Sequence, residues 1–452
     1  MSPNKVPNKV RAAYGIGDYA ICLYWSGVGL YLLYFYTDVV GISPLLAGWL
    51  YALGIAWDAI TDPFMGYLAE RTRTKMGSYR PYIFYGAIPL AFSFILLFWV
   101  PPFEGAELFV FLLAINLFHR TCFTIVSVPY SSLTARITDD SDERTKLTTA
   151  RMIGASFGTL TVSALGFPIV LFFGGTNEAF GFIFLGILCG LMAVIVLSIT
   201  VRFVQEREFN SSALQLPSFA KVFKSVVNNY PFWIVFGSIL ILGSTSIMFN
   251  NNLIYFVKYS LNLHEYQGLI LGVSSGSALL AIPLWAYAAL KIGKRNSWMT
   301  AMTILIIGFL IFYFSSIDSL FELLLILGFI GIGNGATGVL FWSMLPDTIE
   351  YGEWKTGVRT ESSLYGFMTF AQKAAIAFAA LLLGMILTQI GFEPNSTQSE
   401  KTLYELKFVM TWIPLAGIFL SFVLVSFYPI DKTYHQKLIF EIENKKLNHE
   451  TN

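Results

Sequence analysis

Twelve long apolar runs, one after another, are the feature that most limits how this chain can fold. A helix needs about 20 mostly apolar residues to cross the hydrocarbon core of a bilayer, and backbone polar groups in lipid favour helices. We therefore expect an all-α membrane protein with twelve transmembrane helices. Their predicted extents are 13–37, 44–70, 80–100, 107–135, 148–174, 178–202, 231–257, 265–290, 297–316, 319–346, 362–391 and 406–429.

Composition supports a membrane protein. Of the 452 residues, 55% are hydrophobic, 16% aromatic and only 13% charged, whereas a soluble domain carries about 25% charged residues. The mean hydropathy is +0.63. The net charge of +1 gives no reason to expect a nucleic-acid partner.

Cys22, Cys122 and Cys189 lie inside apolar runs, which favours small buried hydrophobes over disulfides. The polar, basic N-terminus shows no removable signal peptide.

The chain divides into two halves. The longest polar stretch, 203–230, separates the sixth and seventh runs. We expect an N-terminal six-helix bundle at 1–202, a cytoplasmic linker at 203–230, and a C-terminal six-helix bundle with a cytoplasmic tail at 231–452. Two short repeats support a duplication, because KMG at 75–77 matches KIG at 291–293 and YSSL at 130–133 matches WSML at 342–345. Two pseudo-symmetric six-helix bundles are the major facilitator architecture.

Basic residues fall on one side of the predicted spans. The loops after the first and third spans carry no lysine or arginine, whereas those after the second, fourth and eighth are basic. By the positive-inside bias, both termini should be cytoplasmic in a multi-pass protein of the cell membrane. The basic residues are Arg71, Arg73, Lys75, Arg80, Arg144, Lys146, Lys291, Lys294 and Arg295.

Charged side chains inside the spans are candidates for function. Each costs at least roughly 2.5–3.5 kcal/mol at the bilayer centre, so such residues usually line a pathway. Three are acidic and three are basic, so the set can neutralise itself. They are Asp18, Asp58, Asp62, Arg120, Arg151 and Lys373.

Asp58 and Asp62 form the most informative pair. Their spacing of four places both on one face of the second span, with the Thr61 hydroxyl nearby. Hard oxygen donors suit sodium, and two close carboxylates can also hold a proton. The pair therefore predicts a coupling site for a cation or a proton, with sodium at Asp58 and Asp62 as one form. The alternative is an internal salt bridge to Arg120 or Lys373 that only joins helices.

Candidate sugar-binding residues lie in other spans. Arg151 and Lys373 offer hydrogen-bond donors to hydroxyls or anionic groups. Arg151 could instead extend to the membrane interface, since it lies only about one turn inside its predicted span. Trp25, Tyr130 and Trp342 could stack on a sugar ring, although aromatic residues in membrane helices more often serve packing.

Several motifs together resemble one transporter family. They are YGIGD (14–18), FYTDVVG (35–41), WDAITDPFMG (57–66), the run 143–151 and DTIEYGEWKTGVRTES (347–362). The chain resembles the glycoside-pentoside-hexuronide cation symporters, the melibiose permease-like family of the major facilitator superfamily, over nearly its whole length. The resemblance implies sugar uptake driven by sodium, lithium or a proton, through alternating access of two halves.

The resemblance also implies roles for individual residues. The cation site falls on Asp58 and Asp62, with Thr124 from the fourth span. The sugar-binding arginine and lysine fall on Arg151 and Lys373. We include two further substrate candidates, Asp18 and Thr369.

This chain departs from the melibiose-type site at three positions. Cys22 and Ser127 stand where galactoside-binding acids are expected, and Ser131 stands where a stacking tryptophan is expected. Without those acids the site is more positive, which leans toward a hexuronide or another anionic glycoside.

Arg120 is a further departure, because it replaces a glycine close to the cation site. A guanidinium there could pair with Asp58 or Asp62 and take the place of sodium. We therefore expect proton coupling or only weak dependence on sodium. No cofactor is expected beyond the coupling ion, Na⁺ or H⁺.

A polar motif at the predicted cytoplasmic face completes the set of candidates. We expect these residues to contribute to gating: Arg71, Arg144, Asp347, Glu353, Arg359 and Glu361.

The sequence also allows alternatives to a symporter. An uncoupled facilitator or a lipid-type carrier would keep the same fold. A membrane-embedded enzyme would need a catalytic or metal-binding cluster, and the four histidines show no HExxH spacing. The expected partners are a small-molecule sugar or glycoside and the lipid bilayer, and we expect a monomer.

Overall fold

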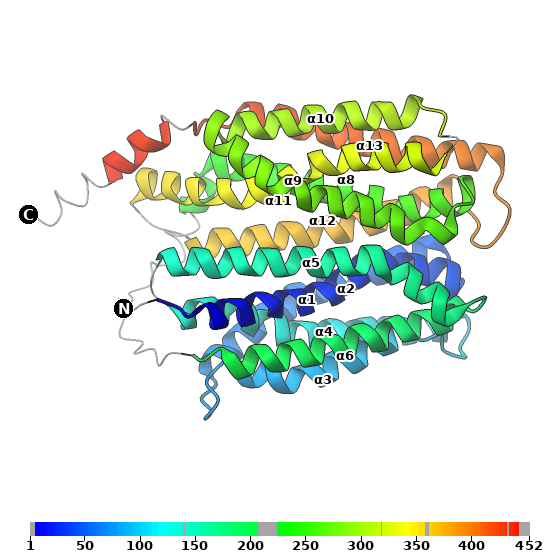
Figure 1. Cartoon of the computed structure of the whole chain (residues 1–452), viewed down its shortest axis with the longest axis horizontal. Coiled ribbons are helices and arrows are strands. Elements are labelled where there is room, and N and C mark those ends of the chain that lie inside the picture. Colours follow the sequence, from blue (N-terminus) through cyan, green and yellow to red (C-terminus); the bar gives the residue numbers. More distant parts are fainter. Residues whose placement is uncertain are drawn as a thin grey trace, which may run out of the picture. The chain divides into compact units, whose positions relative to one another are not determined.

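The computed structural model describes residues 5–138, 141–206, 224–317, 319–357, 361–431 and 434–442, and the described part is helical (Figure 1). Twelve of its helices are long and apolar enough to cross a membrane, which confirms the predicted spans. Their bounds are α1 Asn8–Tyr34, α2 Pro44–Arg71, α3 Arg80–Leu97, α4 Gly105–Ile137, α5 Ser141–Gly174, α6 Glu178–Phe203, α8 Tyr230–Tyr255, α9 Gln267–Ile292, α10 Lys294–Phe314, α11 Leu320–Thr356, α12 Glu361–Gln389 and α13 Glu400–Ser426.

One predicted boundary was wrong by almost three turns. Hydropathy ends the tenth span at residue 346, but α11 continues to Thr356 and stops where Gly357 takes a φ of +69°. The reason is that hydropathy detects the part of a helix that lies in lipid, not the hydrogen-bonded helix itself. The polar residues 347–356 remain helical because nothing before Gly357 breaks the helix; Pro346 is accommodated within it.

The described chain forms two compact units. The first comprises Met1–Ser211, Asn250–Gly272 and Ala380–Leu403, and the second comprises Ser212–Phe249, Val273–Ala379 and Tyr404–Asn452. The first unit therefore takes in short segments from the second half of the chain. Much of the predicted linker at 203–230 lies outside the described residues.

Helix α1 lies at the centre of the first unit. It contacts α5 and α6, and 78% of its apolar window is buried. Glycines allow α1 and α5 to approach closely, because a methyl group at Gly158 would lie 2.6 Å from the Tyr19 carbonyl oxygen, and one at Gly15 would lie 2.7 Å from that of Ala150. Small residues at a crossing are a common way for membrane helices to pack.

The repeated KMG and KIG motifs have similar backbone forms. Gly77 precedes α3 with a φ of +107°, and Gly293 precedes α10 with a φ of +84°. Both lie in the left-handed region, which glycine adopts without a steric penalty. The short repeat in the sequence thus marks the same kind of turn before corresponding helices.

The ends of α1 and α8 are also alike. Each passes into a five-residue π-helical turn, η1 at Phe35–Val39 and η2 at Phe256–Ser260, and a short 3-10 turn, η3, follows at His264–Tyr266. The residues after the π turns, Gly41 and Asn262, both have positive φ, at +84° and +53°. The two turns and the two positive-φ residues are separated by the same 221 positions (256 − 35 and 262 − 41).

Glu143 joins the start of α5 to the start of α1. Its carboxylate accepts hydrogen bonds from Arg11 at 2.7 Å, Lys146 at 2.9 Å and the Val6 backbone N–H at 3.0 Å. The bonds from Lys146 and Arg11 lower the pKa of Glu143 to about 2. The stabilisation is therefore present above the unfolded pKa of about 4.3 and is lost as the pH falls toward 2.

Glu143→Gln should therefore lower the thermal unfolding temperature at pH 7 and have a shrinking effect as the pH falls. Melting curves of both proteins between pH 7 and pH 3 test this, with Glu107→Gln as the control because Glu107 is an exposed first-turn acid of α4. A difference between the two proteins that stays constant with pH would show that the charge of Glu143 is not what matters.

Candidate functional site

The predicted sugar-binding arginine pairs with an acid on the neighbouring helix. Arg151 Nε donates to Asp18 Oδ2 at 2.8 Å, and Asp18 is buried. The glycine contact between α1 and α5 makes this possible, since Gly15 and Gly154 lie within one turn of the pair and pack against each other. Arg151 therefore points into the protein, and the alternative in which it extends to the membrane interface is wrong.

Aromatic rings hold the Arg151 guanidinium from the side. Its Cζ lies 5.1 Å from the Tyr130 ring centre and 5.8 Å from that of Tyr14. The two rings stack at 4.9 Å, and the Tyr130 hydroxyl donates to the Tyr14 carbonyl oxygen. Arg151 Nη2 also reaches the Ser131 hydroxyl at 3.5 Å. The predicted residues Asp18, Tyr130, Ser131 and Arg151 thus form one cluster.

Asp58 is held in a buried ion pair. Arg120 Nη1 lies 2.9 Å from Asp58 Oδ2, and the side chains are only 6% and 1% exposed. Arg120 Nε also donates to Asn116 Oδ1 at 3.4 Å, and its Cζ lies 5.5 Å from the Tyr51 ring centre. Opposite charges at this distance stabilise each other strongly once both are out of water. The expected approach of Arg120 to the acid pair is therefore present.

Asp62 has different surroundings on the same helix. The Thr124 hydroxyl donates to Asp62 Oδ1 at 2.7 Å, as the resemblance implied. The Thr61 hydroxyl instead donates to the carbonyl oxygen of Trp57 at 3.1 Å, one turn back in α2. Asp62 is half-buried, whereas Asp58 is buried. Two acids four residues apart are thus placed in two different electrostatic environments.

The acid pair fits a bound sodium ion poorly. A sodium site would need oxygens from both carboxylates turned to one point, but Asp58 Oδ2 is already bound to the Arg120 guanidinium. A second positive charge beside that guanidinium would be repelled. Asp58 and Asp62 both stay candidate coupling residues.

Three other predicted substrate-binding residues belong to the first unit, and they take no part in the Asp18–Arg151 or Arg120–Asp58 pairs described above. Trp25 stacks on Phe123, with ring centres 6.0 Å apart, so packing accounts for part of its surface. Cys22 is half-buried with a free thiol, and Ser127 is half-buried.

The remaining substrate candidates belong to the second unit. Trp342 packs against Phe341 in α11, with ring centres 4.8 Å apart. Thr369 is exposed and Lys373 is half-buried in α12. Their roles in binding stay predictions.

One residue of the motif predicted at the cytoplasmic face, Asp347, belongs to a well-defined ion pair. Lys294 Nζ binds both carboxylate oxygens of Asp347, at 2.6 and 2.8 Å. Asp347 also belongs, with Glu350 and His435, to a group whose oxygen and nitrogen atoms lie within 4.8 Å of one another. Because the Lys294 ammonium already neutralises Asp347, this group is better suited to an ion-pair network than to a metal ion.

The other members of the motif are less informative. Arg71 lies over the Tyr67 ring, with Cζ 3.9 Å from its centre, and Glu353 is half-buried. Arg359, and the side chains of Arg144 and Glu361, lie outside the described part of the structure.

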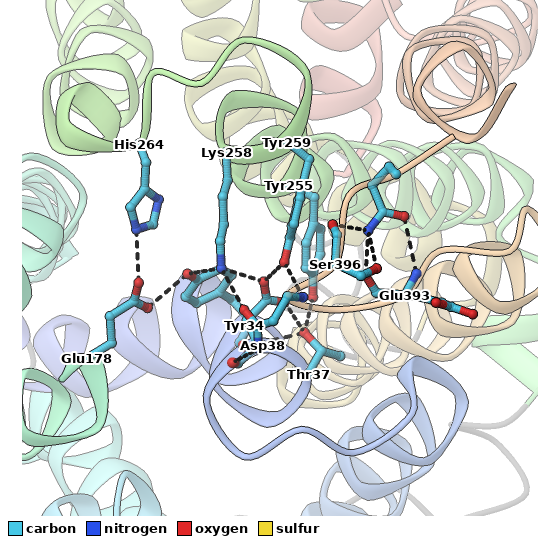
Figure 2. A network of polar contacts seen from close by, with 12 residues as sticks. Tyr34, Thr37, Asp38, Glu178, Tyr255, Lys258, Tyr259, His264, Glu393 and Ser396 are labelled. Carbon is cyan, nitrogen blue, oxygen red and sulfur yellow. Dashed lines mark hydrogen bonds and ion pairs between the residues drawn. The ribbon is translucent and has the colours of Figure 1, made fainter. Parts of the chain in front are cut away.

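A polar network at the far ends of α1 and α8 was not predicted (Figure 2). Its centre is Asp38, whose Oδ1 lies 2.8 Å from Lys258 Nζ. A second pair joins Glu178 Oε1 to His264 Nε2 at 3.0 Å. Asp38 was noticed only as part of a family motif, and Lys258 ends an apolar run, where charged residues are ordinary. The pairing itself has no local signal in the sequence, because it joins residues 220 positions apart.

Known proteins resemble this chain over almost its full length. A family model described as MFS/sugar transport protein matches residues 13–432. The isoprimeverose transporter of Lactiplantibacillus pentosus is 30% identical over 446 residues, which cover 98% of this chain and 92% of that protein. The glucuronide carrier protein homolog of Escherichia coli strain K12 is 28% identical over 436 residues, or 96% and 95% of the two chains.

A solved structure shares the fold. It is that of a bacterial homolog to the human lysosomal transporter Spinster, in an inward-facing and unoccupied conformation. Its TM-score is 0.70 over 97% of this chain and 99% of that chain, with 11% sequence identity.

Twelve spans with this likeness define a transporter of the major facilitator superfamily. The family match is more specific, and the protein belongs to the glycoside-pentoside-hexuronide symporters within that superfamily. It is a sugar transporter of the membrane, and the enzyme alternative is excluded because the family consists of transporters.

Gly158→Val should separate α1 from α5 and lower stability by about 1–3 kcal/mol, the usual cost of overpacking. Thermal unfolding of the purified protein measures this. The matched control is Gly29→Val in α1, since a methyl group at Gly29 would meet nothing within 4 Å. Equal losses in the two variants would contradict a specific role for the glycine contact.

Arg120→Ala should destabilise the protein by about 3–5 kcal/mol, because it leaves the Asp58 carboxylate buried without its cation. Sodium chloride should then raise the unfolding temperature of the variant more than choline chloride does, whereas the original protein should show little difference.

The double variant Arg120→Ala with Asp58→Asn supplies the control, because it removes both charges and should recover most of the loss. An Arg120→Ala protein that unfolds like the original would show that the ion pair contributes nothing.

Proposed function

We propose that this protein couples the uptake of a glycoside, pentoside or hexuronide to a proton by alternating access. The observation that supports the proposal is the buried Arg120–Asp58 ion pair, in which a guanidinium already binds one carboxylate of the predicted cation pair. Cation coupling itself rests on the family resemblance and on the acids within α2.

Asp62 is the residue assigned to the proton. It lies on the same helix face as Asp58, but it is half-buried and accepts a hydrogen bond from Thr124. Protonation of Asp62 removes a charge within the membrane, which lowers the cost of a conformational change that moves it. Asp58 is not assigned this step, because protonating it would leave the Arg120 charge unbalanced.

Arg151 is the residue assigned to the sugar. Asp18 and the two tyrosine rings hold its guanidinium in one orientation, and a guanidinium can bind hydroxyls or a carboxylate. The acids of a melibiose-type site are replaced by Cys22 and Ser127. These features support a substrate with an anionic group, and one relative is named as a glucuronide carrier homolog.

The proposed setting is the cell membrane, with both termini in the cytoplasm and a monomer as the working unit. The basic loops after the second, fourth and eighth spans support this orientation.

Uptake into proteoliposomes tests the coupling. Radiolabelled isoprimeverose and methyl glucuronide are the two probes, each measured with an inward proton gradient, an inward sodium gradient or neither. We expect accumulation above the external concentration with the proton gradient alone. Accumulation that requires sodium and ignores the proton gradient would overturn proton coupling, and equilibration under every condition would favour an uncoupled facilitator.

Asp62→Asn should reduce gradient-driven accumulation to simple equilibration, while the thermal shift produced by the sugar remains. Glu107→Gln, an exposed acid of α4, should leave both unchanged. Normal accumulation by Asp62→Asn would show that Asp62 has only a structural role.

A further inference from the structure

The π turns at the ends of α1 and α8 bring two charged segments together. Each turn contains a residue of the pair, Asp38 in η1 and Lys258 in η2. A π turn adds a residue to a helical turn and so changes the direction of the side chains after it, and such turns are frequent at functional sites. Both segments lie in the same compact unit, although 220 positions separate Asp38 from Lys258.

Asp38 is fully enclosed by hydrogen-bond donors. Its side chain has no exposed surface, and its Oδ1 accepts from Lys258 Nζ at 2.8 Å and from the Tyr259 hydroxyl. The Thr37 hydroxyl lies 2.8 Å from Oδ2. Asn395 Nδ2 donates to the Asp38 backbone carbonyl oxygen at 2.5 Å. The carboxylate therefore ties η1 to η2, and the backbone carbonyl of the same residue ties η1 to the segment that follows α12.

A second pair continues the network (Figure 2). Glu178, the first residue of α6, accepts from the Tyr34 hydroxyl at 2.9 Å and lies 3.0 Å from His264 in η3. The Tyr34 oxygen in turn accepts from Lys258 Nζ at 3.0 Å. Tyr34 thus connects the two pairs, so that one continuous set of contacts joins α1, α6, η2 and η3.

We propose that this network is a latch that closes the transporter at the membrane face opposite its N-terminus. Asp38 follows the whole length of α1, so it lies across the membrane from residue 8, where that helix begins. The inference rests on the proposed alternating access, which requires each face to close in turn.

The polar chemistry of these contacts is better suited to a closure that opens and re-forms than to a permanent structural contact. Lys258 is 18% exposed and Glu178 and His264 are each 23% exposed, so water reaches the rim of the network. When the segments separate, water can replace the hydrogen bonds to the polar groups that are lost. A contact made of apolar side chains has no such replacement.

Labelling of Cys22 with a membrane-impermeant maleimide tests the latch without substrate or gradient. Cys22 is half-buried in α1 and lies sixteen residues before Asp38, or roughly 24 Å along the helix. The buried Cys122 and Cys189 are first replaced by alanine. Right-side-out membrane vesicles then expose only the outer face, and detergent-solubilised protein calibrates the intrinsic reactivity of Cys22.

The double variant Asp38→Asn with Lys258→Gln should raise the outer-face labelling rate about tenfold, because the closed state loses its central ion pair without leaving a buried charge. Lys258→Arg should keep the original rate. Glu393→Gln is the control on the same face, since Glu393 is exposed and only its backbone joins the neighbouring contacts.

An unchanged rate in the double variant, with Cys22 still reactive in detergent, would overturn the latch. An equal rise in Glu393→Gln would do the same, since it would show general loosening. The labelling result is independent of the proton-coupling proposal. A raised labelling rate together with sodium-driven uptake would support the latch and would contradict proton coupling.

Discussion

The buried ion pair between Arg120 and Asp58 determines the charge balance of the two acids in α2. It allows two acids to share a helix face without two unbalanced charges, because Arg120 neutralises Asp58 at 2.9 Å. An uncompensated carboxylate at that depth would be costly. The pair leaves Asp62, half-buried and bonded to Thr124, in a separate environment. Asp58 is therefore neutralised within the protein, and Asp62 is the acid to which we assign the proton.

Helix α1 and the π turn that follows it carry one acid of each of two further ion pairs in the first unit. Its glycine contact with α5 sets Asp18 against Arg151, and its far end carries Asp38 in the latch. Asp18 and Asp38 are twenty residues apart, or roughly 30 Å along a continuous helix. A shift of α1 would therefore move the Asp18–Arg151 cluster, which we propose binds the sugar, together with the proposed latch, and alternating access requires such a connection.

The sequence was sufficient for the spans, for the family and for the acid pair, because each depends on local pattern or on motifs. It left open which partner each charged side chain takes. Arg151 could have reached the interface or turned inward, and only the approach of α1 to α5 decides between these. Asp38 and Lys258 were missed because their pairing joins segments far apart in the chain. The length of α11 was missed because a polar helical extension has no hydropathy signal.

The central claim is that a proton, not sodium, moves with the sugar. The most direct measurement is the external pH of a weakly buffered suspension of de-energised proteoliposomes when methyl glucuronide or isoprimeverose is added. Proton symport predicts a transient rise in external pH as substrate enters, in the absence of sodium, and no rise with Asp62→Asn. Uptake of the labelled sugar with no change in external pH would contradict the account.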